Sequence, residues 1–204
     1  MHPLKYLTSL TLSFATATSA FIVERNLPDG IYEVNDLFEE SKSIQWEDYS
    51  VPIPISRVKC YKDHGTLNST DHRRAVDHLW SYCSHINVPP HGAFFSVVGE
   101  AVAFVCSSGR QSRCHWHEWD DAEEEMNETC GEGRDGHVEM NKLLKEYGRS
   151  HIGEDICHSL NMESGLNWEV EMIPVLVNEQ TYAQWKLAVQ ENSEVGGSKN
   201  GSMG

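Results

Sequence analysis

Residues 93–106 read AFFSVVGEAVAFVC, two apolar runs on either side of a Gly99-Glu100 pair. Short apolar runs that flank a glycine turn are typical of two buried strands joined as a hairpin. The sequence therefore predicts a β-hairpin at 93–106, and the segments before and after it can be placed around that hairpin.

The segments before the hairpin predict a strand and a helix. Residues 57–61, RVKCY, form the expected first core strand, and SVPIPIS at 50–56 leads into it. The two prolines exclude this leading segment from the centre of a sheet, because they lack the N–H groups that a ladder needs. A helix is expected from Asn68 onward with Ser69 or Thr70 as its cap, since apolar residues recur there at three- and four-residue spacing. They are Ala75, Val76, Leu79, Trp80 and Cys83.

The segments after the hairpin predict a second helix and further strands. The stretch CHWHEWDDAEEEM at 114–126 begins a helix that ends at Cys130, where Gly131 is a suitable stop residue. Strand pieces are expected at 137–140 and 147–156, with a short helical piece between them. Alternation of apolar and polar residues predicts a strand at 166–172, and residues 179–191 have the pattern of an amphipathic helix.

This element order predicts an α+β fold, an antiparallel or mixed sheet with two helices packed on one face and an added C-terminal strand and helix. Four parts of the chain are expected. Residues 1–20 are a signal peptide, 21–50 an extended acidic lead-in, 51–191 a single disulfide-bonded domain, and 192–204 a disordered tail rich in glycine and serine.

The N-terminal stretch MHPLKYLTSLTLSFATATSA has the form of a secretory signal, with Lys5, a short apolar part and small residues up to Ala20. The apolar part is too short to span a bilayer. We therefore expect a secreted protein without stable membrane insertion.

The cysteines agree with an oxidising compartment, because their number is even and no C-x-x-C spacing suggests a metal site. They are Cys60, Cys83, Cys106, Cys114, Cys130 and Cys157. If each element reverses direction, Cys60 and Cys130 lie at one end of the sheet. A bond between them leaves Cys157 to pair with Cys83, Cys106 or Cys114. Three sequons, at Asn68, Asn127 and Asn200, are candidates for glycosylation.

Taken together, the runs VKCY (58–61), HLWSYC (78–83), AVAFVC (101–106), CGEGRDGHV (130–138) and EYGRSHIGEDIC (146–157) resemble small cysteine-rich proteins secreted by filamentous fungi. The resemblance is to the killer-toxin-like and necrosis-inducing effectors, which share a strand–helix–strand–strand–helix–strand core. It covers about residues 55–160 and implies an effector role, but it transfers no catalytic residues. The long lead-in and the C-terminal elements depart from that pattern.

The formal charge of −15 disfavours nucleic acid as a partner, because phosphate backbones would be repelled. One basic run, His72-Arg73-Arg74, is interpreted as a solvated helix face because Asp71 and Asp77 flank it. A monomer is expected.

Metal binding was considered at His115, His117 and Glu118. Side chains two residues apart on a helix point about 200° from each other, so one ion would not easily take both histidines. The carboxylates after them are placed where a helix N-terminus favours negative charge. A capped, solvated helix start is therefore favoured, and no metal or cofactor is predicted.

Several enzymatic and inhibitory alternatives remain open. A nuclease or a metal-dependent hydrolase needs acid, base and cationic groups, and such residue types occur at His91, Glu100, Arg110, His137, Arg149 and His151. Their spacing matches no signature. Arg149 is expected to pair with a carboxylate beside a strand bend at Gly148.

The segment 107–113, with Arg110 and Arg113, is a possible contact loop that would suit a protease inhibitor. A secreted killer-type toxin is a further alternative. The favoured interpretation is a secreted effector that binds a host protein or another extracellular target.

Overall fold

The apolar hairpin forms β5 (Ala93–Val98) and β6 (Ala101–Ser107), as predicted, and lies inside the main sheet. The computed structural model describes residues 21–36, 52–61, 65–83, 86–109, 111–158 and 168–173. Gly99 in the hairpin turn has a φ of 58°, a conformation that favours glycine. Its backbone N–H donates to Asp29 Oδ1 at 2.9 Å, which ties the turn to the N-terminal part of the chain.

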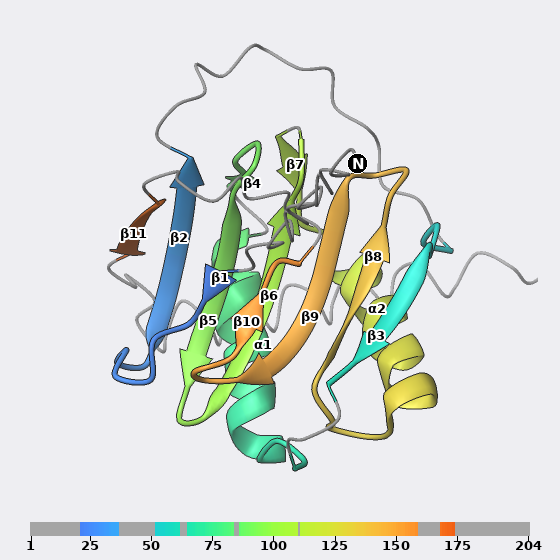
Figure 1. Ribbon diagram of the computed structural model, residues 1–204, viewed down its shortest axis with the longest axis horizontal. Coiled ribbons are helices and arrows are strands. Elements are labelled where there is room, and N and C mark those ends of the chain that lie inside the picture. The colour runs from blue at the N-terminus through green and yellow to red at the C-terminus, as the bar shows by residue number, and fades with distance from the viewer. Residues whose placement is uncertain are drawn as a thin grey trace, which may run out of the picture.

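The main sheet has seven strands in the order β11-β2-β5-β6-β9-β8-β3, and every neighbouring pair is antiparallel. Its remaining strands are β2 (Gly30–Asp36), β3 (Arg57–Cys60), β8 (Gly136–Met140), β9 (Lys145–His151) and β11 (Trp168–Ile173). The helices α1 (Ser69–Cys83) and α2 (Trp116–Cys130) cover one face (Figure 1). The expected α+β class, with two helices on one face, is confirmed.

The other face carries a small two-stranded sheet of β1 (Phe21–Ile22) and β10 (Asp155–Ile156), which lies in front of the main sheet in Figure 1. A second small sheet, β4 (Asn87–Val88) with β7 (Ser112–Arg113), lies at one end of the hairpin.

The N-terminal part of the domain differs from the expected boundary. Residues 21–36 were assigned to an extended lead-in, yet β2 pairs with β5 on one side and β11 on the other. Tyr32 of β2 is buried and stacks on Phe95, with ring centroids 4.9 Å apart. Residues 21–36 thus belong to the folded domain. The expected signal peptide, the helix at 179–191 and the tail lie outside the described residues, and so does Asn200.

The residue that caps the first helix lies one position before the expected cap residues. Asn68 Oδ1 accepts hydrogen bonds from the N–H groups of Thr70 at 3.0 Å and Asp71 at 3.1 Å, so Asn68 is the cap rather than Ser69 or Thr70. The second helix ends as predicted, since the N–H of Gly131 (φ 100°) donates to the carbonyl of Asn127. Residues 141–144 form a tight turn instead of a helical piece, because Leu143 N–H donates to the Met140 carbonyl and Leu144 has a φ of 53°.

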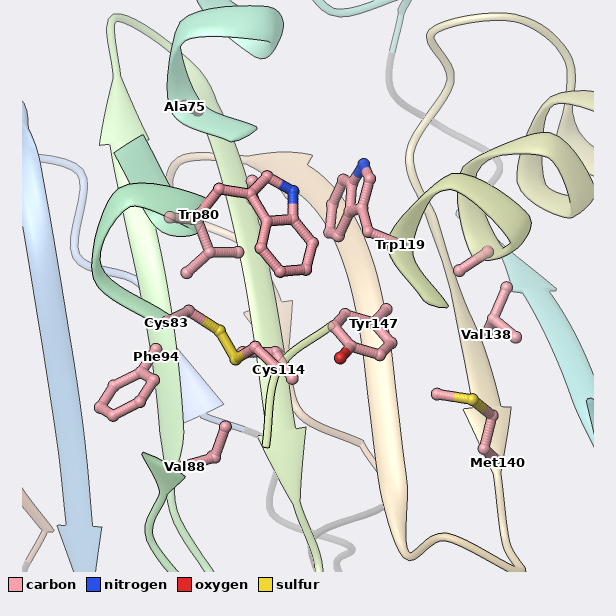
Figure 2. Close-up of a cluster of buried hydrophobic side chains, with 14 of the residues drawn as sticks. Ala75, Trp80, Cys83, Val88, Phe94, Cys114, Trp119, Val138, Met140 and Tyr147 are labelled. Carbon is pink, nitrogen blue, oxygen red and sulfur yellow. A yellow bond between two sulfur atoms is a disulfide. The ribbon is translucent and has the colours of Figure 1, made fainter. Parts of the chain in front are cut away.

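The apolar core has two layers, one on each face of the sheet. The larger layer lies under the helices, where Trp80 of α1 and Trp119 of α2 extend toward β-strand residues such as Tyr147 (Figure 2). The smaller layer lies under β1 and β10, and Phe95, Phe104 and Ile156 are fully buried in it. Both layers use alternate side chains of β5 and β6, which explains why the hairpin is apolar throughout.

All six cysteines are paired. The predicted Cys60–Cys130 bond is confirmed, with Cα atoms 5.3 Å apart, and Cys157 pairs with Cys106 at 5.6 Å. The third bond, Cys83–Cys114 at 5.4 Å, links the end of α1 to the start of α2 (Figure 2). These disulfides fit an extracellular protein. In the described part of the chain, no helix has the length and apolar character to cross a membrane.

Candidate functional site

The start of α2 contains the residues that were considered as a metal site. His115 precedes the helix and has extended backbone angles (φ −137°, ψ 127°), so helical spacing does not apply between it and His117. Their rings stack with centroids 5.6 Å apart, and the predicted divergence is wrong. Among the described residues, no group of three or more His, Cys, Asp or Glu side chains is arranged to hold a metal ion.

The prediction that α2 starts with solvated acidic residues is wrong for Glu118. Its side chain is fully buried, and Glu118 Oε2 accepts hydrogen bonds from Lys145 Nζ and Tyr147 Oη, both at 2.8 Å. Tyr147 Oη in turn accepts from the His115 N–H at 3.2 Å. Burial, with the Glu118 charge, raises the pKa of Tyr147, so the phenol keeps its proton for this bond. The three side chains fix the start of α2 to β9.

Exposed side chains surround this anchored helix start. Trp116 is 43% exposed, whereas Trp119 takes the buried position on α2. Arg113 on β7 is also exposed, as predicted for the contact loop, while Arg110 lies outside the described residues. Leu144, in the turn between β8 and β9, is 36% exposed, and its carbonyl accepts from the Ser108 N–H at 2.8 Å. We call Arg113, Trp116 and Leu144 the contact end; β7 and the turn between β8 and β9, which carry two of these residues, lie near the top of Figure 1.

The residues considered for a nuclease do not form one site. His137 and Arg149 lie on opposite faces of the sheet, since His137 pairs with Gly148 in the β8–β9 register and Arg149 contacts α2. His91 and Glu100 lie near opposite ends of β5. His151 bonds Asp135, with Nδ1 and Oδ2 2.7 Å apart. The described members of this set are therefore dispersed.

His137 is the centre of a buried polar cluster on the face opposite the helices. Its Nδ1 lies 2.6 Å from Tyr61 Oη, its Nε2 lies 3.3 Å from Glu139 Oε1, and its ring stacks on His158 at 5.0 Å. Burial lowers the pKa of His137 to about 3, so the ring is neutral. Lys59 lowers the pKa of Glu139 through a 3.0 Å ion pair, against the opposing effect of burial. A neutral His137 then accepts from Tyr61 and donates to Glu139, and both ring nitrogens are used.

A cavity of about 260 Å³ lies between α1 and α2, with β9 beneath it. From α1 it is lined by Ser69, His72, Arg73, Val76 and Asp77, and from α2 and β9 by Glu123, Asn127 and Arg149. Leu67, Glu132 and Gly133 complete the lining. Residues from three separate elements thus converge on one hollow.

His72 is the unusual residue of this cavity. Its side chain is 10% exposed, and its Nδ1 lies 3.6 Å from Glu123 Oε1. Its Nε2 is buried and has no hydrogen-bond partner in the part of the chain that the structure describes. Burial lowers the pKa of His72, although the Glu123 charge acts in the opposite direction. A neutral ring whose Nδ1–H faces the carboxylate leaves Nε2 as an acceptor.

Arg149 forms the floor of the cavity and is 1% exposed. Its Nε donates to the Arg134 carbonyl at 2.7 Å, Nη1 to Glu123 at 3.3 Å, and Nη2 to Asn127 Oδ1 and the Gly131 carbonyl. The predicted pairing of Arg149 with a carboxylate is confirmed. Gly148 pairs with His137 in the β8–β9 ladder, and a Cβ at that position would lie 2.2 Å from Phe104 Cζ.

Sequence reasoning missed His72 and its cavity. The basic run 72–74 was interpreted as a solvated helix face, but His72 is buried and only Arg73 and Arg74 are exposed. A signal was present, because His72 precedes Ala75, Val76 and Leu79 at helical spacing. The sequons also differ in structure: Asn68 is exposed, whereas Asn127 is partly buried and its amide oxygen is bonded to Arg149.

Comparison of the chain with protein-family models, with curated proteins and with solved structures gave no match.

Proposed function

We propose that this chain is a secreted effector-type protein that acts by binding a host protein or another extracellular target through the contact end. The observation that carries the proposal is the exposed Trp116 beside the anchored start of α2. Aromatic and arginine side chains dominate the energetics of protein interfaces, and Trp116 and Arg113 supply both types.

Two further features support this proposal. Three disulfides suit a protein that works outside the cell that makes it. Apart from the two-residue strands β4 and β7, the element order from β3 to β8 is also the one expected for the core of such effectors.

The contact end is pre-organised for binding. Lys145 and Tyr147 hold the start of α2, and the Ser108–Leu144 bond holds the neighbouring turn. A rigid surface loses less conformational entropy when a partner binds.

The experiment is affinity capture from host extracellular fluid and host cell extract with three forms of the mature protein. The forms are the wild type, the double variant Trp116→Ala/Leu144→Ser, and the control Ile22→Ser. Ile22 is 60% exposed on β1, away from the contact end, so its replacement is a matched loss of exposed apolar surface. A partner retained by the wild type and the control but lost by the double variant is expected. Equal retention by all three forms, or no retained partner, would contradict the proposal.

A further inference from the structure

We propose that the cavity between α1 and α2 binds one neutral sugar unit, with His72 and Arg149 as the residues that recognise its hydroxyl groups. This site is separate from the contact end and does not depend on the proposed function. It is formed by the first half of α1 and the second half of α2, whereas the contact end surrounds the start of α2.

His72 supplies an acceptor that no group of the described residues satisfies. Glu123 lies beside Nδ1, which places the ring proton there and leaves the lone pair of Nε2 available. A buried polar atom without a partner destabilises the protein, so a ligand that donates to Nε2 recovers this free energy. A sugar hydroxyl is such a donor.

Arg149 supplies a matching donor. A guanidinium group has five N–H groups, and four of those of Arg149 are used by Arg134, Glu123, Asn127 and Gly131. Among the described residues the second N–H on Nη1 has no acceptor, and we assign it to an oxygen of the ligand, because Arg149 lines the cavity. His72 Nδ1 and Arg149 Nη1 both lie close to Glu123 Oε1, at 3.6 Å and 3.3 Å, so the two side chains meet at the same carboxylate of the cavity lining.

The charges around the cavity favour a neutral ligand. Two basic residues, Arg73 and Arg149, are outnumbered by three acidic ones, Asp77, Glu123 and Glu132. A phosphate or carboxylate would meet this acidic excess, and a metal ion would meet the buried Arg149 charge. Carboxylates and arginine bond hydroxyl groups without requiring a charge on the ligand.

The size and the walls of the cavity fit a single ring. Pockets for drug-sized molecules measure about 300–1,000 Å³, so 260 Å³ suits a smaller ligand. Leu67 and Val76 supply an apolar wall, which suits the C–H face of a pyranose ring, while the polar residues face its hydroxyl groups.

The test is a binding titration by isothermal calorimetry and by ¹H–¹⁵N NMR. The probes are the methyl glycosides of glucose, galactose, mannose, xylose and N-acetylglucosamine, together with short oligosaccharides ending in each of them. We expect at least one to bind the wild type and to shift amide signals of the cavity residues. If a methyl glycoside binds, a single sugar unit is sufficient for recognition. If only an oligosaccharide binds, the ligand is the end of a sugar chain.

Two histidine variants on the same helix test the recognition. His72→Phe keeps a ring but removes the acceptor, and we expect at least tenfold weaker binding. His78→Phe is the matched control, because His78 does not line the cavity, and its affinity should equal that of the wild type. His72→Gln retains an acceptor and should bind more tightly than His72→Phe.

Three results would overturn the proposal. They are the absence of binding for every sugar, an unchanged affinity of His72→Phe, and displacement of the sugar by inorganic phosphate at equal concentration. If His72→Phe does not fold, the amide shifts of the wild type decide, since shifts confined to residues outside the cavity would place the sugar elsewhere.

Discussion

Two buried histidines of this protein differ in how their ring nitrogens are used. His137 is fully buried, and Tyr61, Glu139 and the ring of His158 surround it. His72 is nearly as buried, but it lines a cavity and its Nε2 has no partner among the residues that the structure describes.

The difference separates a structural role from a recognition role. A satisfied polar cluster stabilises the fold, and removing one member leaves the others unpaired. An unsatisfied buried atom beside a hollow contributes little to stability and is available to a ligand.

The largest effect is expected for His137→Ala. The change removes a buried ring and leaves the Tyr61 hydroxyl and the Glu139 carboxylate without their bonds to it. We expect the free energy of unfolding to fall by about 3 kcal/mol. Urea denaturation followed by tryptophan fluorescence, with the disulfides intact, measures this value. A loss below about 1 kcal/mol would show that the cluster is not stabilising.

Gly148→Ala tests the packing on the same face of the sheet. A Cβ at this position would lie 2.2 Å from Phe104 Cζ, so the Phe104 ring must move in a tightly packed layer. We expect a loss of about 2 kcal/mol in the free energy of unfolding. Gly65→Ala is the control, because no atom lies within 4 Å of the added Cβ, and the two variants should differ clearly in urea midpoint.

Acidification should lower the contribution of the neutral His137 to the free energy of unfolding. Its pKa is about 3 in the folded protein against an ordinary value of 6.5, so below pH 6.5 the unfolded chain binds a proton that the folded protein does not. The stabilisation is therefore complete above pH 6.5 and is lost as the pH falls toward 3, by at most about 1.4 kcal/mol per pH unit.

His137→Gln provides the reference, since glutamine can also accept from Tyr61 and donate to Glu139 but does not titrate. The difference in unfolding free energy between wild type and variant should shift in favour of the variant between pH 6.5 and pH 4. A constant difference would show that His137 titrates normally in the fold.

The smallest effect is expected for His72→Ala. No hydrogen bond of Nε2 is lost, and the deleted ring opens onto an existing cavity. We expect less than about 1 kcal/mol of destabilisation by the same urea assay. A loss as large as that of His137→Ala would show that the two histidines play the same structural role.

The sequence predicted those features that depend on local pattern. The hairpin at 93–106, the helix ending at Gly131 and the Cys60–Cys130 bond follow from apolar spacing, a glycine and the alternating direction of elements. Each of these predictions rests on the residues of one element or on the order of a few elements along the chain.

The burial of polar side chains could not be predicted in the same way, because it depends on partners that are distant in the chain. Glu118 is buried by Lys145, 27 residues away, and His72 faces Glu123 across two helices. Local sequence around both residues is charged and indicated a solvated surface. Local sequence also does not decide which of the two tryptophans is buried, and in the fold Trp119 is buried whereas Trp116 is 43% exposed.

The disulfides also have a consequence for proteolysis. The loops closed by Cys60–Cys130 and Cys106–Cys157 overlap between residues 106 and 130, so together they span residues 60–157 without a gap. One cut of the backbone at any point in that span leaves both ends joined through a sulfur bridge. A protease acting on this part of the chain must therefore cut more than once before it can release a fragment.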